Sequence, residues 1–273
     1  MFASFNNIDS FDFFNILEQS AHFENVAKGR KGAIILAERS NRLGLSLANA
    51  QEVPIKLIVS SPNIVRSTTQ YKNPPTYFLP IHYQILDNIK KIFPGFEANN
   101  AMIEIYDNNY KSMGYHSDLA LDLADDSFIA IFSCYESSHN NRDNNRMLYV
   151  RDKTTGLENH LKMENNSVII FSTETNKRFQ HKIVLEADSS PRWLGITFRL
   201  SKNTCPLNNI TIATDEQRTE FYTFRKRENN ETNFIYPSNI SYTLSPSDLL
   251  SPIQLDQNSY PIQLGIYSHQ NSC

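Results

Sequence analysis

The sequence is short of cysteine and has no long apolar run. Its three cysteines, Cys134, Cys205 and Cys273, are an odd number without a C-x-x-C pair. This argues against a disulfide framework or a zinc knuckle and favours a reducing compartment. Apolar runs such as residues 33–37 and 167–171 are far too short to span a bilayer, so we expect no membrane partner. The N-terminal residues lack the basic and apolar regions of a signal peptide, which favours a cytoplasmic or nuclear location.

The chain also lacks a strong excess of either charge. A net charge of −3 and a pI near 6.2 predict no general attraction to nucleic acid, although they leave room for a local basic patch. Hydrophobic residues make up 40% of the 273 positions, which is enough for a sizeable core in one large β domain or two small ones.

The first part of the chain, residues 1–98, predicts a mixed α/β region that packs on a larger core. We expect helices at 10–19 and 79–95 and strands at 32–38 and 54–60. Asp9 or Ser10 suits the cap of the first helix, and Pro80 suits the first turn of the second. The second helix carries an apolar stripe that consists of Ile81, Ile85, Ile89 and Ile92.

Residues 99–202 have the pattern of a β-sandwich of jelly-roll type. Short apolar runs alternate with polar loops at 101–106, 127–133, 147–150, 167–172, 180–185 and 193–200. Residues 203–273 then predict one helix, with Thr214 and Gln217 forming a capping box, and an irregular extension after it. The chain is therefore expected to be α+β and mainly β, with a jelly-roll core, N-terminal helices and a C-terminal extension.

The stretch GYHSDL places His116 two residues before Asp118. At a strand end, residues i and i+2 point to the same face and are able to bind one ion, although an H-x-D pair alone is a weak signal. A mononuclear iron site needs two imidazoles and one carboxylate, so a histidine from a distant strand is missing. His181 lies in a strand-like run and is the best candidate; the alternative is an ordinary half-buried strand histidine. The other histidines lie in helix-like segments, in polar loops or near the chain end: His22, His82, His139, His160 and His269.

Two arginines, Arg192 and Arg199, follow His181 within eighteen residues. Arg199 lies in the strand-like run ITFR. An arginine that faces into a β-sandwich is costly unless it meets an anion, and its planar fork suits a carboxylate. The alternative is an arginine on a solvated face.

In this order, these residues resemble the motif of the AlkB branch of the Fe(II)/2-oxoglutarate dioxygenases. The pattern covers roughly residues 60–200 and comprises Tyr106, His116, Asp118, His181, Arg192, Thr197 and Arg199. The resemblance implies a double-stranded β-helix, or jelly roll, in which His116, Asp118 and His181 hold Fe(II).

The resemblance also implies a role for each remaining residue of the pattern. Arg199 would pair with a carboxylate of the cosubstrate 2-oxoglutarate, and Arg192 would hold another part of it or the site wall. Tyr106 would donate a hydrogen bond to the cosubstrate, and Thr197 would line the pocket. With O₂, the family hydroxylates C–H bonds and forms succinate and CO₂. On an N-methyl group, hydroxylation releases formaldehyde.

The sequence departs from the family pattern at three places. Glu104 stands where the family usually has asparagine, so it must face away, be protonated or pair with an arginine. Residues 119–121 are Leu-Ala-Leu, where the AlkB repair enzymes tend to have acidic residues that help hold the damaged base. Arg192 and Arg199 are separated by one residue more than usual, which a β-bulge would absorb.

The substrate is less well defined than the reaction. The resemblance favours alkylated DNA or RNA, and the basic clusters at 225–227 and 177–178 are compatible with it, although such clusters are usually solvated faces. The loop 66–77 lies where AlkB-like proteins carry a lid, and it is otherwise a simple connector. The alternatives are the same chemistry on a protein side chain or small molecule, and a jelly-roll binding module without turnover.

Overall fold

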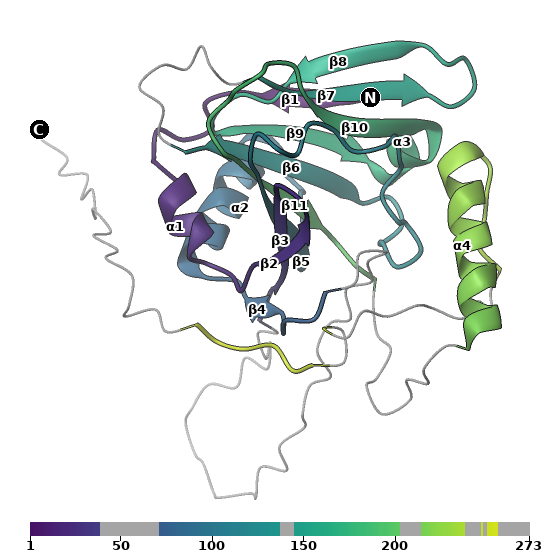
Figure 1. Cartoon of the computed structure of the whole chain (residues 1–273), viewed down its shortest axis with the longest axis horizontal. Helices are drawn as coiled ribbons and strands as arrows, with labels where there is room; N and C mark the ends of the chain where they lie inside the picture. The colour runs from purple at the N-terminus through teal and green to yellow at the C-terminus, as the bar shows by residue number, and fades with distance from the viewer. Residues whose placement is uncertain (39–70, 137–144, 203–213, 238–246, 248–249, 256–273) are drawn as a thin grey trace, which may run out of the picture.

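The computed structural model describes residues 1–38, 71–136, 145–202, 214–237, 247 and 250–255 (Figure 1). In this part of the chain, two β-sheets face each other and helices lie outside them. The strands are β1 (Ala3–Phe5), β2 (Glu24–Ala27), β3 (Arg30–Leu36), β4 (Thr76–Tyr77), β5 (Asn100–Tyr106), β6 (Phe128–Tyr135), β7 (Arg146–Asp152), β8 (Glu158–Lys162), β9 (Ser167–Ser172), β10 (Phe179–Leu185) and β11 (Trp193–Arg199). The helices are α1 (Phe14–Glu18), α2 (Pro80–Ile92), α3 (Thr173–Arg178) and α4 (Asp215–Asn230).

The major sheet has the strand order β1-β9-β6-β11-β5-β3-β2, with β4 beside β3. The minor sheet has the order β10-β7-β8. All pairs are antiparallel except β3 with β4. These two sheets confirm the predicted fold class, α+β and mainly β with a jelly-roll core. The segment 1–98 supplies β1 to β4 to the same major sheet, so it is continuous with the core.

Period-two alternation gives the major sheet two apolar faces. In β6, Ala130 and Phe132 pack among the helices, whereas Ile129 and Ile131 point toward the minor sheet. The same alternation occurs in β9 and β11. Because both faces are buried, these strands appear in the sequence as nearly continuous apolar runs.

Helix α2 covers the outer face of the major sheet. Pro80 occupies its first turn, and Ile81, Ile85 and Ile89 are buried in the core. Ile92 is 37% exposed, so the buried stripe is one residue shorter than predicted. No helix among the described residues has the length and apolar character that a bilayer crossing needs.

The predicted first helix is much shorter in the structure. Helix α1 begins at Phe14 rather than next to Asp9 or Ser10. The Asp9 carboxylate instead accepts hydrogen bonds from the side-chain amides of Gln84 and Asn88 on α2, at 3.0 and 2.7 Å. The acidic group that suited a cap therefore ties the N-terminal segment to α2.

Other elements differ from the predictions in smaller ways. Strands β1, β2, β4 and β8 and helix α3 were not predicted, and the predicted strand at 54–60 lies outside the described residues. The predicted helix with its Thr214–Gln217 capping box is confirmed as α4. Strand β8 is an exposed edge strand, so it lacks the apolar alternation that marks a half-buried strand.

The buried His82 on α2 should make the protein less stable in acid. Its ring is fully buried, accepts from the Leu79 amide at 2.9 Å and lies 2.9 Å from the Ser20 hydroxyl. Burial lowers its pKa to about 3 from 6.5, so between these values the unfolded chain binds a proton that the folded chain does not. The free energy of unfolding should therefore fall as the pH drops from about 6.5 toward 3, by up to about 1.4 kcal/mol per pH unit from this group.

Urea unfolding at several pH values between 7.5 and 4.5 measures this effect. The variant His82→Gln should lose this part of the pH dependence, whereas His22→Gln, at an exposed histidine, should retain it. An equal slope in wild type and His82→Gln would show that His82 is not the acid-sensitive group.

Candidate metal centre

The first metal-ligand candidate is held in place by backbone pairing. The segment 111–116 runs along β10, with hydrogen bonds from Met113 N to Ile183 O at 3.3 Å and from Leu185 N to Lys111 O at 2.8 Å. His116 and His181 face each other directly, and each amide donates to the other carbonyl, at 3.0 and 2.7 Å. This pairing brings two imidazoles together from positions 65 residues apart in the chain.

Asp118 is fixed by a buried asparagine on α3. The Asp118 amide donates to Oδ1 of Asn176 at 2.8 Å, and Nδ2 of Asn176 donates to the Asp118 carbonyl at 2.8 Å. Asn176 is 1% exposed, so this pair of hydrogen bonds to the backbone of Asp118 is shielded from water. The side chain of Asp118 is left free to point toward the histidines.

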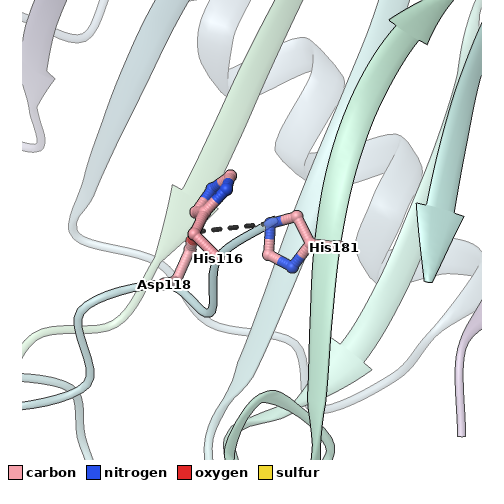
Figure 2. A group of neighbouring side chains, drawn as sticks. All are labelled: His116, Asp118 and His181. Atoms are coloured by element: carbon pink, nitrogen blue, oxygen red, sulfur yellow. Dashed lines mark ion pairs between the residues drawn. The ribbon is translucent and has the colours of Figure 1, made fainter. Parts of the chain in front are cut away.

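Figure 2 shows the three side chains converging from the loop that carries His116 and Asp118 and from strand β10, which carries His181. One ligand atom from each lies within 4.8 Å of the others. Nε2 of His181 and Nε2 of His116 lie 3.5 and 3.8 Å from Oδ1 of Asp118. These distances exceed normal hydrogen bonds, and they approach the separation of about 3 Å expected for neighbouring ligands around one metal ion.

The protonation states suit metal binding. Nδ1 of His116 lies 3.0 Å from the Gly114 carbonyl, and a proton donated there leaves Nε2 with a free lone pair. Burial, together with His181, lowers the pKa of His116 to about 4, so the ring is neutral at neutral pH. Burial raises the pKa of Asp118, but the neighbouring His181, Arg199 and His116 outweigh it and hold the pKa well below its ordinary range. Two imidazoles and one carboxylate are the donor set of a mononuclear iron site.

Arg199 at the end of β11 completes the group. Its Nη1 lies 3.6 Å from Oδ2 of Asp118, and its side chain is 8% exposed. Three buried atoms of this group have no hydrogen-bond partner in the described part of the chain: Oδ2 of Asp118, Nδ1 of His181 and Nε of Arg199. Buried polar atoms without partners are rare in folded proteins. Nε of Arg199 and Oδ2 of Asp118 fit a bound ligand that accepts from the arginine and a metal ion that the carboxylate binds.

A cavity of about 800 Å³ opens beside these residues. It is lined by Arg30, Met102, Tyr110, Ser112, Met113, Gly114, Tyr115, His116, Ser117, Asp118, Leu119, Gln180, Arg199, Tyr222, Arg225, Lys226, Asn229 and Asn230. Four of these side chains are cationic, and Asp118 is the one carboxylate among them. The cavity therefore suits an anionic ligand next to a metal.

Glu104 takes the third of the three arrangements that the sequence left open, a pair with an arginine. Nε of Arg30, on the adjacent strand β3, donates to Oε1 of Glu104 at 2.7 Å, and the Tyr106 hydroxyl donates to Oε2 at 2.7 Å. Burial and then Glu104 raise the pKa of Tyr106 well above its ordinary value, so Tyr106 remains a phenol. Its hydroxyl proton is thus directed to Glu104. Tyr106 and Thr197 share a sheet face with Arg199, but neither lines the cavity.

The pair Arg30–Glu104 predicts a large stability effect. Glu104→Ala leaves the largely buried Arg30 charge without its partner, which should lower the free energy of unfolding by about 3–5 kcal/mol. Glu104→Gln keeps an acceptor for Tyr106 and should cost less. The double variant Arg30→Met with Glu104→Met, which removes both charges, should recover part of the loss. Urea unfolding of the wild type and these three variants measures the differences in stability. A double variant less stable than Glu104→Ala would contradict the prediction.

The structure does not bring Arg192 to the cavity. Residues Trp193 to Arg199 pair with β5 in an unbroken register, so no bulge absorbs the extra residue between the two arginines. Arg192 and Arg199 are seven positions apart, and an odd separation on a regular strand places them on opposite faces. Arg192 accordingly pairs with Glu18 and Glu136 and lies over the Phe14 ring of α1.

The residues of the two predicted basic clusters do not form one surface; each has its own partner or position. Lys177 pairs with Glu174, and Arg178 pairs with Asp152. On α4, Arg225 is buried in a pair with Glu228, Lys226 lines the cavity and Arg227 pairs with Glu231. Arg225 and Lys226 are therefore the members of these clusters that line the cavity. Of the predicted lid, residues 66–70 lie outside the described part, and Tyr71 is buried beside Gly32.

The other histidines do not join the centre. His22 lies between α1 and β2, outside any helix, and His82 is buried in α2. His160 lies in strand β8 rather than in a loop, where it contacts the Tyr149 ring. His139 and His269 lie outside the described residues.

Comparisons with known proteins give little further information. No family model matches the chain, and no curated protein matches it. A solved structure titled "The structure of OsALKBH1" aligns with 72% of this chain and 97% of its own, at 10% identity and a TM-score of 0.47. A prolyl-4-hydroxylase from Pseudomonas putida aligns with 43% of this chain and 58% of its own, at 15% identity and a TM-score of 0.29.

Proposed function

We propose that this protein is an Fe(II)- and 2-oxoglutarate-dependent oxygenase. The observation that carries the proposal is the cluster of His116, Asp118 and His181 beside Arg199, with three buried polar atoms that lack partners. Iron(II) bound there with 2-oxoglutarate and O₂ supplies hydroxylation of a C–H bond, with release of succinate and CO₂. His116, Asp118 and His181 would hold the ion through two imidazoles and one carboxylate, a donor set that would leave room for the cosubstrate.

The residues of the chain divide the remaining tasks among them. His116, Asp118 and His181 hold the metal, and the backbone bonds between the two histidines keep them in place. Arg199 neutralises a carboxylate of the cosubstrate, because its guanidinium is buried next to Asp118 and has unused donors. The cavity, with its excess of cationic side chains, receives the dianion and the substrate.

For the substrate, we propose an N-alkylated base of DNA or RNA, which hydroxylation would demethylate with release of formaldehyde. Three tyrosines line the cavity, Tyr110, Tyr115 and Tyr222, and aromatic rings are the surfaces on which unstacked bases bind. Tyr222 is 46% exposed and Lys226 lines the cavity beside it, which suits a base with its phosphate.

A second substrate class has its own support. Leu119 lines the cavity directly after the ligand Asp118, together with Met102 and Met113. These apolar side chains suit an alkyl or amino-acid side chain better than a cationic damaged base. The alternative is therefore hydroxylation of a protein side chain or a small molecule by the same iron chemistry.

Succinate formation by the purified protein tests the proposal. The assay contains Fe(II), ascorbate and 2-oxoglutarate, with and without short DNA and RNA strands that carry 1-methyladenine or 3-methylcytosine. Formaldehyde in equal amount to succinate, produced with the methylated strands alone, supports demethylation. Succinate formation that is independent of the methylated strands but is lost in Asp118→Ala would support the oxygenase activity. The substrate would then be sought among proteins or metabolites. No turnover and no iron binding would refute the oxygenase itself.

A further inference from the structure

Helix α4 lies at the periphery of the molecule, apart from both sheets (Figure 1). Three of its residues are buried, Phe221, Arg225 and Glu228, and two of these are charged. A helix that packs on a core normally buries an apolar stripe. The contacts that dock α4 are instead mostly polar, and their partners identify what the helix does.

The buried face of α4 binds the backbone of the segment that carries the metal ligands. Nη2 of Arg225 donates to the Ser117 carbonyl at 2.9 Å, and the Ser117 amide donates to Oδ1 of Asn229 at 3.0 Å. The Ala120 amide donates to Oε1 of Glu228 at 2.9 Å. Ser117 lies between His116 and Asp118, so α4 binds both the amide and the carbonyl of the residue that separates the two ligands.

The C-terminal end of α4 is attached beside the third ligand. Gln180, the neighbour of His181, donates from Nε2 to the Asn229 carbonyl at 2.6 Å. Lys153, which follows β7, donates to the Glu228 carbonyl at 2.6 Å. The last carbonyls of a helix lack partners within the helix, so these two bonds both complete α4 and fix its position.

An adjoining side of the same helix forms a wall of the cavity. The residues of α4 that line it are Tyr222, Arg225, Lys226, Asn229 and Asn230. Arg225 and Asn229 belong to both sets, since each bonds to the backbone of Ser117 and also lines the cavity. A molecule in the cavity that touches α4 therefore touches the element that holds the metal ligands.

We propose that α4 is a positioning helix for the metal centre, which couples occupancy of the cavity to the geometry of His116 and Asp118. The inference rests on the proposed metal site. Because coupling is reciprocal, metal binding should also strengthen the docking of α4. Residues that orient the ligands of a metal typically change its affinity by about 10–100-fold when they are replaced.

Equilibrium titration with Co(II), followed by its visible absorption, tests the inference without turnover. Arg225→Met should raise the dissociation constant for Co(II) by about 10–100-fold, and Arg225→Lys should recover part of the affinity. The matched control is Arg227→Met, two residues away on the same helix, where the exposed pair with Glu231 is lost and the affinity should stay within about twofold. Asn229→Ala leaves no buried charge without its partner. It replaces Arg225→Met in the titration if that variant fails to fold.

Hydrogen exchange gives an independent readout. The amides of Ser117 and Ala120 should exchange faster in Arg225→Met and Asn229→Ala, and Co(II) should slow the exchange of α4 amides in the wild type. A folded Arg225→Met with unchanged Co(II) affinity and unchanged exchange at Ser117 would overturn the inference. If the wild type binds no Co(II), the proposed metal site fails, and the exchange of Ser117 and Ala120 still decides whether α4 positions the segment.

Discussion

Replacement of His181 by alanine is expected to abolish Fe(II)-dependent conversion of 2-oxoglutarate to succinate, with a loss of at least about 1000-fold. Loss of a residue that merely orients a ligand costs about 10–100-fold, and loss of the ligand removes the bond itself. His181 is 4% exposed, faces Asp118 at 3.5 Å and is paired through its backbone with His116, so no other described histidine is placed to replace it.

The matched control is His160→Ala. This histidine also lies in the minor sheet, but it is exposed on β8 and lies outside the metal centre. It should retain the wild-type turnover and the wild-type Co(II) affinity. Both variants should keep the far-ultraviolet dichroism of the wild type, because the backbone pairing of β10 does not depend on the ring. Full turnover in a folded His181→Ala would exclude His181 as a ligand.

Replacement of Arg199 by methionine is expected to raise the KM for 2-oxoglutarate by about 100-fold. A buried charge-assisted bond to a carboxylate is worth about 2–5 kcal/mol when one partner is removed, and each 1.4 kcal/mol is about tenfold. Arg199→Lys keeps the charge without the planar fork, so its KM for 2-oxoglutarate should lie between those of the wild type and Arg199→Met. The Co(II) affinity of each variant must be measured alongside, because Arg199 also lies 3.6 Å from Asp118.

Arg192→Met is the natural comparison, because the sequence pattern gave both arginines a role at the cosubstrate. Arg192 lies on the helix side of the sheet with Glu18 and Glu136, so its loss should leave the KM for 2-oxoglutarate within about twofold of the wild type. Since these pairs are partly exposed, the effect on stability should be small. A large rise in KM for Arg192→Met with none for Arg199→Met would reverse the assignment.

Most of the core fold was predictable because its strands are buried on both faces. The six apolar runs between residues 101 and 200 all correspond to strands. Strands β1, β2 and β8 were missed because they are short or lie at sheet edges, where few side chains are buried. The helix predicted from residue 10 failed because Asp9 has a better partner in α2, a contact that no local pattern predicts.

Part of the arrangement of the candidate site could be predicted from the sequence, and the physical basis differs from residue to residue. His116 and Asp118 are two positions apart, and their local spacing alone places them on one face. The position of Arg192 follows from its odd separation from Arg199 only because the strand is unbroken, which points the two arginines apart. A bulge would have hidden this, and nothing in the sequence decides whether a bulge is present.

The long-range contacts of the site were beyond sequence reasoning. Arg30 and Glu104 are 74 positions apart, and their pairing depends on the register of β3 and β5. The sequence limited Glu104 to three arrangements without choosing among them. Arg225 and Glu228 have the spacing of an exposed ion pair on a helix, so their burial against the ligand segment had no sequence signal.

The pairing of segment 111–116 with β10 also bears on solubility. Strand β10 is an edge of the minor sheet, and it carries the apolar side chains Ile183 and Leu185. An uncovered apolar edge is a template on which another chain adds a strand. The metal-ligand segment covers this edge through its backbone bonds to Ile183 and Leu185. Damage that frees the segment should therefore appear as self-association of the protein as well as loss of the centre, and light scattering would detect it before activity is assayed.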